Sequence, residues 1–106
     1  MFEMFKKDTG KVINVNDIDN LVGKVELIDI RETFEYKRGS IKSAKNIPMK
    51  ELLENSEKYL NKDKEYYIVC QSGGRSKTAC NKLIDKGYDV VNVAGGVGSY
   101  IGTKRN

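Results

Sequence analysis

One stretch of the sequence joins an apolar strand pattern to an amphipathic helix pattern through a loop of small residues. Residues 66–70 are almost uninterrupted in their apolar character, which is typical of a parallel strand covered on both faces. The loop that follows contains Gly73 and Gly74, and residues 76–84 then repeat apolar side chains at helical spacing. A strand that passes into a helix in this way favours an α/β fold, with the loop at the carboxyl edge of the sheet.

The rest of the chain alternates between further strand and helix patterns. Strands are expected at 12–15, 25–29, 44–47 and 90–93, and helical segments at 16–22, 32–37, 51–55, 56–60 and 97–101. The 16–22 helix should begin at Asn16 or Asp17 and end at Gly23. The chain of 106 residues is thus expected to form one α/β domain with a central parallel sheet of about five strands and helices on both faces. Residues 1–11 and 102–106 are expected to be frayed or loosely packed.

Composition narrows the class of protein. No apolar run approaches the roughly 20 residues of a membrane span, and the N-terminal residues lack the apolar centre of a signal peptide, so we expect a cytoplasmic protein. The net charge of +4 is spread along the chain without a dense cluster. This distribution favours an ordinary solvated surface over nucleic-acid binding, although a mild positive field would attract small anions.

The chain has two cysteines and no histidine. Cys70 ends a predicted strand and Cys80 lies on the apolar side of the following helix, so their Cα atoms should be too far apart for a disulfide. We expect two free thiols, with Cys80 packed in the core. Without histidine there can be no Cys-His pair and no His-based metal site, and two cysteines cannot form a four-thiolate zinc site. No metal and no cofactor are expected.

The position of Cys70 predicts a reactive thiol. A glycine-containing loop before a helix directs several backbone N–H groups toward one point, and the helix dipole adds partial positive charge there. Amides, dipole and the nearby Arg75 should lower the pKa of a thiol at that point, so a thiolate would form near neutral pH. Gln71 and Ser72 would lie near the mouth of the loop.

Four segments resemble single-domain rhodaneses, which are sulfurtransferases. The segment from Cys70 to Ser76 is similar to their active-site loop, and residues 27–32 are similar to a strand that ends in Asp-x-Arg. Residues 34–48 are similar to a segment that ends in Asn-Ile-Pro, and residues 87–96 are similar to the last strand with its Gly-Gly turn. Two positions depart from the family pattern, because Ser40 stands where the family usually has His and Ser43 where it usually has Gly. The resemblance covers roughly residues 12–101, which we take as the core of a single rhodanese-like domain spanning 1–106.

The resemblance implies a catalytic role for Cys70 and a thiosulfate sulfurtransferase-like reaction. The Cys70 thiolate would take the outer sulfur of a small anionic donor such as thiosulfate, hold it as a persulfide, and pass it to cyanide, a small thiol or a dithiol protein. The substrate-binding residues would be the remaining members of the loop, namely Gln71, Ser72, Gly73, Gly74, Arg75 and Ser76. Asp29 and Arg31 would support the loop from the end of the second strand as an ion pair.

Three alternatives remain open. A persulfide carrier fed by a protein partner would use the same cysteine. A phosphatase or arsenate reductase would also use a cysteine, a curled loop and an arginine, but the phosphatase motif has five residues between the two and this chain has four between Cys70 and Arg75. A noncatalytic binding module could retain the fold as a scaffold only.

Overall fold

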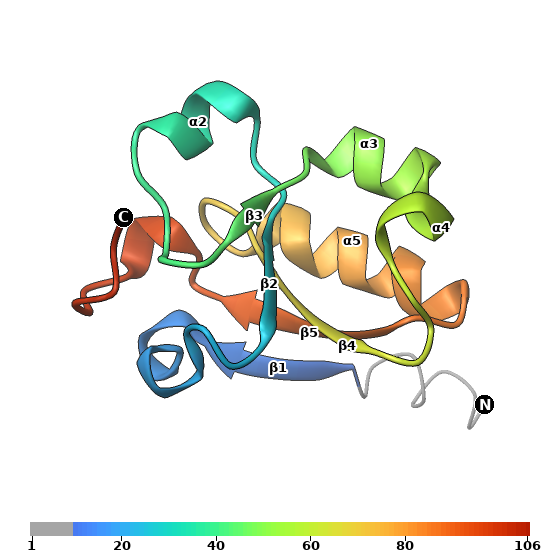
Figure 1. The fold of residues 1–106 in the computed structure, drawn as a ribbon, viewed down its shortest axis with the longest axis horizontal. Helices are drawn as coiled ribbons and strands as arrows, with labels where there is room; N and C mark the ends of the chain where they lie inside the picture. Colours follow the sequence, from blue (N-terminus) through green and yellow to red (C-terminus); the bar gives the residue numbers. More distant parts are fainter. Residues whose placement is uncertain (1–9) are drawn as a thin grey trace.

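The computed structural model describes residues 10–106, and these residues build a sheet of five parallel strands with helices packed against it (Figure 1). The strands are β1 (Lys11–Asn14), β2 (Glu26–Asp29), β3 (Lys45–Asn46), β4 (Glu65–Val69) and β5 (Asp89–Ala94). The α-helices are α2 (Thr33–Lys37), α3 (Met49–Glu54), α4 (Ser56–Tyr59) and α5 (Gly74–Asp85), and the 3-10 helices are η1 (Val15–Asp17), η2 (Asp19–Leu21) and η3 (Val97–Ser99). The predicted α/β class and five-strand parallel sheet are confirmed.

The strand order places β4 at the centre of the sheet. The order is β1-β5-β4-β2-β3, and every pair is parallel, so the carboxyl ends of all five strands share one edge. In the register, Ile68 of β4 lies between Ile28 of β2 and Asn92 of β5. The segments that follow β2, β4 and β5 therefore meet at the same edge, as expected for a ligand site in an open α/β sheet.

Apolar side chains fill both faces of the sheet. On one face, α3, α4 and α5 pack against a cluster that includes Ile68, Leu52 and Leu83, all fully buried. On the other face, Val15 and Ile18 of the 3-10 region and Tyr36 of α2 pack with residues of β2, β4 and β5. Both faces are covered, but the second is covered mainly by short elements.

The helix expected at 16–22 was wrong. Two 3-10 turns, η1 and η2, occupy this segment, and η1 is capped by Asn14, whose Oδ1 accepts a hydrogen bond of 2.9 Å from the backbone N–H of Asn16. The apolar residues Val15, Ile18 and Leu21 recur every three positions, and residues three apart lie on one side of a 3-10 helix. The helix expected at 97–101 is likewise the single 3-10 turn η3.

The C-terminal residues are better anchored than predicted. The backbone N–H of Lys42 donates to Lys104 O at 2.6 Å, and that of Asn106 donates to Ser40 O at 3.1 Å. Arg105 forms an isolated antiparallel bridge with Ile41. The expectation that residues 102–106 are frayed was therefore wrong, although residues 103–106 are exposed and so loosely packed. At the other end, Lys11 already belongs to β1, whereas residues 1–9 lie outside the described residues.

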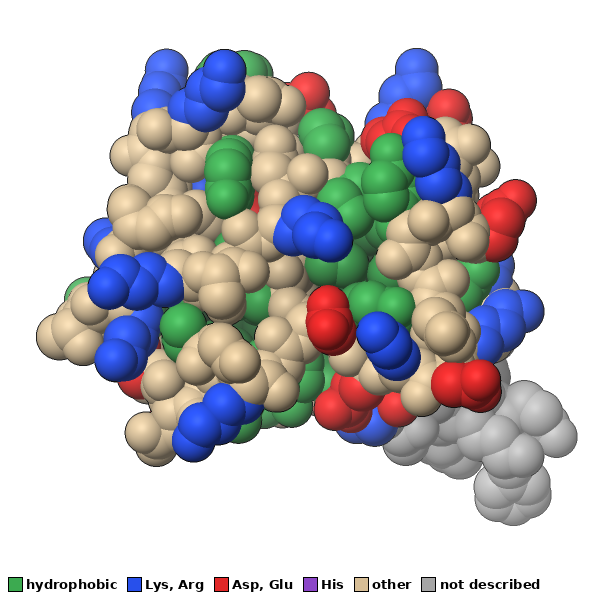
Figure 2. Space-filling view, in the orientation of Figure 1, with side chains coloured by type: hydrophobic (Ala, Val, Ile, Leu, Met, Phe, Trp, Pro, Cys, Tyr) green, Lys and Arg blue, Asp and Glu red, His purple; other side chains and the backbone are tan. Residues whose placement is uncertain are grey.

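The charged side chains are dispersed over the face seen in Figure 2, where lysine and arginine side chains stand apart from one another rather than in one stripe. Within residues 10–106, no helix has both the length and the apolar character that crossing a membrane requires.

Candidate active site

Cys70 directly follows β4, and its Sγ atom is held by the loop that connects β4 to α5. The backbone N–H groups of Gly73 and Ser76 donate hydrogen bonds to Sγ at 3.1 and 3.3 Å. The Oγ atom of Ser76 lies 3.4 Å from the same sulfur. Cys70 is fully buried. The predicted cradle of amides around the thiol is present in the structure.

Two opposing effects set the pKa of Cys70. Burial raises this pKa because the thiolate loses hydration. The Ser76 hydroxyl and the amides of Ser76, Gly73 and Ser72 favour the thiolate by hydrogen bonding, and together they outweigh burial, so the pKa lies below its ordinary value. The first turn of α5 also directs its positive dipole end at this loop. The site thus favours an ionised sulfur without a histidine.

Only one of the two loop glycines needs its conformational freedom. Gly73 has a φ of +103°, and a Cβ atom built there would lie 3.2 Å from Gly95 N. Gly74, by contrast, is the first residue of α5, and a Cβ atom there would meet nothing within 4 Å. Gly73 thus uses the positive φ that glycine permits, whereas Gly74 does not.

A second glycine turn, Gly95-Gly96, supports the loop. The backbone N–H groups of Val97 and Gly98 donate to the carbonyl oxygens of Cys70 and Gln71 at 2.8 and 2.9 Å. Gly96 has a φ of +69°, and a Cβ atom there would lie only 2.5 Å from Cys70 O. This close approach of two backbones explains why the turn needs glycine.

Asn92 is a member of the site that the sequence analysis missed. The Ser76 hydroxyl lies 2.6 Å from Asn92 Oδ1 and 3.1 Å from Gly73 O, so Asn92 helps to position the group beside Sγ. The signal was available in the sequence, since Asn92 is a polar residue inside the apolar strand pattern 90–93.

Arg75 has a partner that the sequence analysis did not find. Its guanidinium donates two hydrogen bonds, of 2.9 and 3.0 Å, to the carboxylate of Glu35 on α2. The Arg75 pairing is the main reason that the pKa of Glu35 is lowered to about 2. Arg75 does not donate a hydrogen bond to Sγ of Cys70, whose partners in the described part of the chain are Gly73 and Ser76. Arg75 closes the loop by joining α5 to α2, with its charge balanced there.

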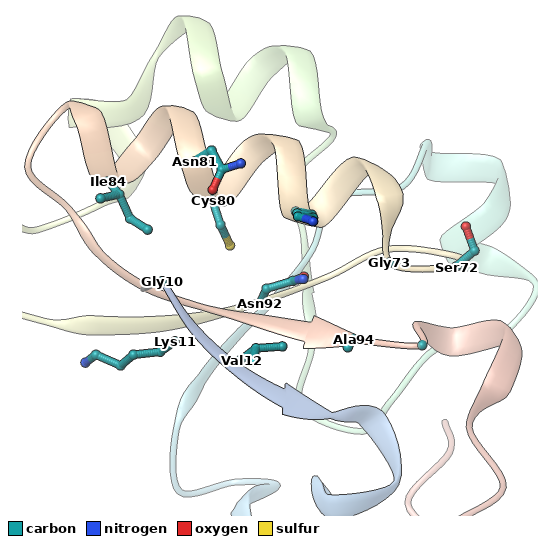
Figure 3. Close-up of a pocket in the computed structure, with 12 residues that line it drawn as sticks. Gly10, Lys11, Val12, Ser72, Gly73, Cys80, Asn81, Ile84, Asn92 and Ala94 are labelled. Carbon is teal, nitrogen blue, oxygen red and sulfur yellow. The ribbon is translucent and has the colours of Figure 1, made fainter. Parts of the chain in front are cut away.

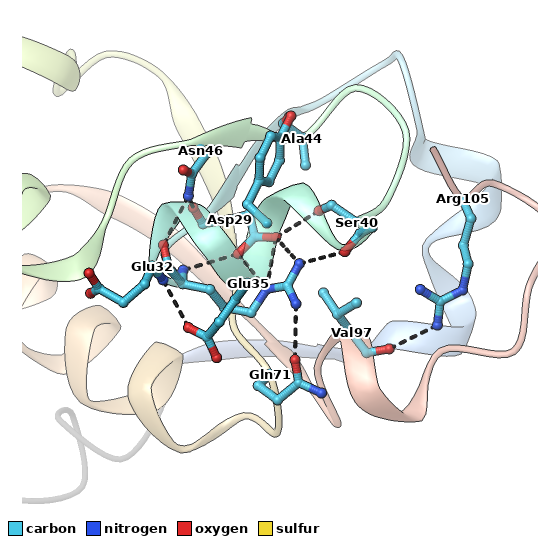
Figure 4. A network of polar contacts seen from close by, with 12 residues as sticks. Asp29, Glu32, Glu35, Ser40, Ala44, Asn46, Gln71, Val97 and Arg105 are labelled. Carbon is cyan, nitrogen blue, oxygen red and sulfur yellow. Dashed lines mark hydrogen bonds and ion pairs between the residues drawn. The ribbon is translucent and has the colours of Figure 1, made fainter.

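Asp29 and Arg31 form a buried ion pair that joins β2 to the loop (Figure 4). Arg31 Nε and Nη2 donate to the Asp29 carboxylate at 2.8–3.1 Å, while Nη1 donates to Gln71 Oε1 at 3.0 Å and Nη2 to Gly39 O at 2.8 Å. The Ser40 hydroxyl donates to Asp29 Oδ2 at 2.7 Å. The pair therefore fixes the side chain of the residue next to Cys70.

The two departures from the family pattern have different structural consequences. Ser40 is fully buried and contributes the hydrogen bond to Asp29. Ser43 has a φ of +71° and is the one described non-glycine residue with positive φ. This conformation explains why glycine is usual at that position. The Ser43 hydroxyl accepts a hydrogen bond of 3.3 Å from the backbone N–H of Gly23.

Two hollows flank the loop. The larger, of about 590 Å³, lies between α5 and the strands β1 and β5, and Cys80 points toward it from α5 (Figure 3). Cys80 is nevertheless 4% exposed, and burial raises its pKa to about 12, so it remains a neutral thiol. The smaller hollow, of about 320 Å³, opens beside Gln71. The described residues contain no cluster of metal-binding side chains.

Comparison with known proteins agrees with this geometry. Residues 14–102 of the chain match the protein family described as "Rhodanese-like domain". The chain belongs to the rhodanese-like domain family. Two relatives come from Bacillus subtilis (strain 168): "Putative sulfurtransferase YtwF" is 43% identical over 72% of this chain and 73% of its own length, and "Putative sulfur carrier protein YrkF" is 34% identical over 74% of this chain and 42% of its own.

A crystal structure of a rhodanese-related protein from Thermoplasma volcanium is similar to this rhodanese-like domain with a TM-score of 0.76 and 37% identity, covering 86% of this chain and 90% of that one. The family resemblance read from the sequence is thus confirmed. Relatives of the sulfurtransferase type support an enzyme of the rhodanese family.

Proposed function

We propose that this protein is a sulfurtransferase in which Cys70 carries the sulfur. The donor is thiosulfate or a related small sulfur anion, and the acceptor is a thiol in the cytoplasm or cyanide in the test tube. The observation that carries the proposal is the thiol of Cys70 inside a cradle of N–H donors that lowers its pKa. A relative named as a sulfurtransferase supports the same reaction class.

The first half-reaction is a displacement at sulfur. The Cys70 thiolate donates an electron pair to the outer sulfur of thiosulfate, the bond between the two thiosulfate sulfurs breaks, and sulfite leaves with that bonding pair. Cys70 then bears a persulfide anion. The N–H groups of Gly73 and Ser76 and the Ser76 hydroxyl, which hold the thiolate, would stabilise the developing charge.

The second half-reaction returns the enzyme to its starting state. A nucleophile attacks the outer sulfur of the persulfide, the sulfur–sulfur bond breaks, and the Cys70 thiolate is restored. No general base is needed, because both attacking groups are anions. Since Cys70 is fully buried, the loop has to open for each reactant, and the exposed residue Ser72 is the one that would move, because Gln71 is held by Arg31 and Gly98.

A persulfide carrier is the second candidate, and it uses the same half-reactions with a protein as donor. The observation in its favour is the relative named as a sulfur carrier protein, of which this chain spans less than half. The four-residue spacing between Cys70 and Arg75 disfavours phosphoryl or arsenate chemistry.

Steady-state kinetics with thiosulfate and cyanide test the proposal. We expect thiocyanate to form by a ping-pong mechanism, with parallel lines in double-reciprocal plots. Cys70→Ser should abolish turnover. Cys80→Ser is the matched control and should retain most of it, because the thiol of Cys80 is buried and un-ionised. Turnover that survives in Cys70→Ser would refute the mechanism.

A further inference from the structure

The smaller hollow beside the loop has arginine side chains on several sides. Its lining includes Arg31, Arg38 and Arg105, with Glu35 and with Gln71 of the loop. We call it the arginine cleft. It lies against the residue that follows Cys70, and its lining also includes Val97 and Gly98, whose N–H groups bind the carbonyls of Cys70 and Gln71. The cleft is thus continuous with the rim of the active-site loop.

The charges of the arginine cleft do not cancel. Arg31 is neutralised by the buried carboxylate of Asp29, and Glu35 is neutralised by Arg75. The side chain of Arg38 makes no hydrogen bond or ion pair with any residue between 10 and 106, and the guanidinium of Arg105 bonds only to carbonyl oxygens there. Two cationic groups therefore face the cleft without a counter-ion among these residues.

The guanidinium of Arg105 is held in position before any ligand binds, whereas that of Arg38 has an aromatic ring as its neighbour. The Nη2 atom of Arg105 donates to Val97 O at 3.2 Å (Figure 4). It also donates to Tyr100 O at 3.1 Å, and the guanidinium lies 5.4 Å from the centre of the Tyr100 ring. The Arg38 group lies 5.6 Å from the centre of the Phe34 ring. Ordered guanidinium groups lose little entropy when they bind an anion, and their planar donors suit carboxylate, sulfonate and phosphate.

The size of the arginine cleft indicates which reactant it serves. In thiosulfate the charged oxygens lie only two bonds from the transferred sulfur, so this donor has to fit within the loop itself. The cleft offers about 320 Å³ beside the loop, the volume of about ten water molecules. Such a space suits a larger molecule whose anionic group is several bonds away from its reacting sulfur.

We propose that the arginine cleft binds the anionic group of a small thiol acceptor that takes sulfur from Cys70. This inference rests on the proposed sulfurtransferase function. The acceptor thiolate attacks the outer persulfide sulfur, a new sulfur–sulfur bond forms on the acceptor, and the Cys70 thiolate leaves with the old bonding pair. During this attack, the carboxylate, sulfonate or phosphate of the acceptor lies between Arg38 and Arg105.

Single-turnover discharge of the loaded protein tests the inference. The full chain is first loaded with thiosulfate, and the gain of one sulfur is confirmed by intact mass before the donor is removed. Discharge is then followed at increasing concentrations of 2-mercaptoethanesulfonate or of uncharged 2-mercaptoethanol. We expect the sulfonate thiol to reach half-saturation at a concentration about three- to tenfold lower, as expected for one or two exposed ion pairs.

Arg38→Gln should raise the half-saturating concentration of the sulfonate thiol about three- to fivefold and leave that of 2-mercaptoethanol unchanged. Arg105→Gln should act in the same direction. Lys82→Gln is the matched control, because it removes one exposed positive charge about 12 Å along α5 from the loop. Lys82→Gln should leave the half-saturating concentrations of both thiols unchanged.

The outcomes separate the two proposals. If sulfur loads onto Cys70 but both thiols discharge it equally, or if Arg38→Gln and Arg105→Gln behave like Lys82→Gln, the arginine cleft has no role in acceptor binding. If no sulfur loads from thiosulfate, the proposed function fails and the cleft proposal falls with it.

Discussion

The Ser76 hydroxyl should account for a measurable part of the low pKa of Cys70. It lies 3.4 Å from Sγ, and Ser76→Ala removes it while keeping the backbone N–H that also binds the sulfur. A hydrogen bond to a charged group contributes about 1.5–3 kcal/mol. Because this one is long and Ser76 also has Asn92 and Gly73 as partners, we take the lower end. About 1.4 kcal/mol corresponds to one pKa unit.

The assay is a pH titration of thiolate ultraviolet absorbance, corrected by the same titration of Cys70→Ser to remove the tyrosine signal. We expect the pKa of Cys70 in Ser76→Ala to rise by about one unit. Cys80 does not interfere, since its pKa is raised to about 12 by burial.

Ser72→Ala provides the matched control, because the Ser72 side chain is exposed and only its amide acts on the thiolate. The pKa of Cys70 in Ser72→Ala should equal that in the wild type. An unchanged pKa in Ser76→Ala, or an equal rise in both variants, would refute the assignment of this stabilisation to the Ser76 hydroxyl.

Three further changes test the supporting structure. Gly96→Ala should destabilise the fold by more than the ~1–2 kcal/mol that positive φ costs an alanine, because its Cβ atom would meet the loop backbone. Gly23 also has positive φ, +82° against +69° at Gly96, but has open space around it, so Gly23→Ala should show only the cost of positive φ in urea unfolding. Equal losses in the two variants would contradict the close approach. Glu35→Gln should cost about 1 kcal/mol at pH 7. Folding lowers the pKa of Glu35 from 4.5 to about 2. The difference in the free energy of unfolding between the wild type and Glu35→Gln should therefore be fully present above pH 4.5 and disappear as the pH falls to 2. A difference that does not depend on pH would exclude the ion pair as its source. Asp29→Asn should lower the free energy of unfolding in urea by about 3–5 kcal/mol, because it leaves Arg31 buried without a counter-ion. A loss below about 1 kcal/mol would show that the ion pair contributes little to stability.

The features that the sequence predicted well depend on neighbours along the chain. The β4-loop-α5 unit follows from an apolar run, a glycine with positive φ and an apolar helical stripe, all within residues 65–85. The same local logic placed Cys80 in the core. Periodicity was read less well in the N-terminal segment, where the three-residue spacing of Val15, Ile18 and Leu21 specifies 3-10 turns rather than an α-helix.

The features that were missed depend on contacts between distant residues. Glu35 and Arg75 are 40 positions apart, and nothing in either local pattern pairs them. The anchoring of residues 102–106 likewise depends on a bridge from Arg105 to Ile41, which exists only once the chain has folded. Asn92 is an intermediate case: its polarity within a strand was visible, but its partner Ser76 belongs to another element.

The most direct test of the central claim is the intact mass of the protein after incubation with thiosulfate, followed by peptide mapping of the added sulfur. Our account predicts the gain of one sulfur atom, located on Cys70, present in Cys80→Ser and absent in Cys70→Ser. A folded and reduced protein that gains no sulfur, or that gains it on Cys80, would contradict the account.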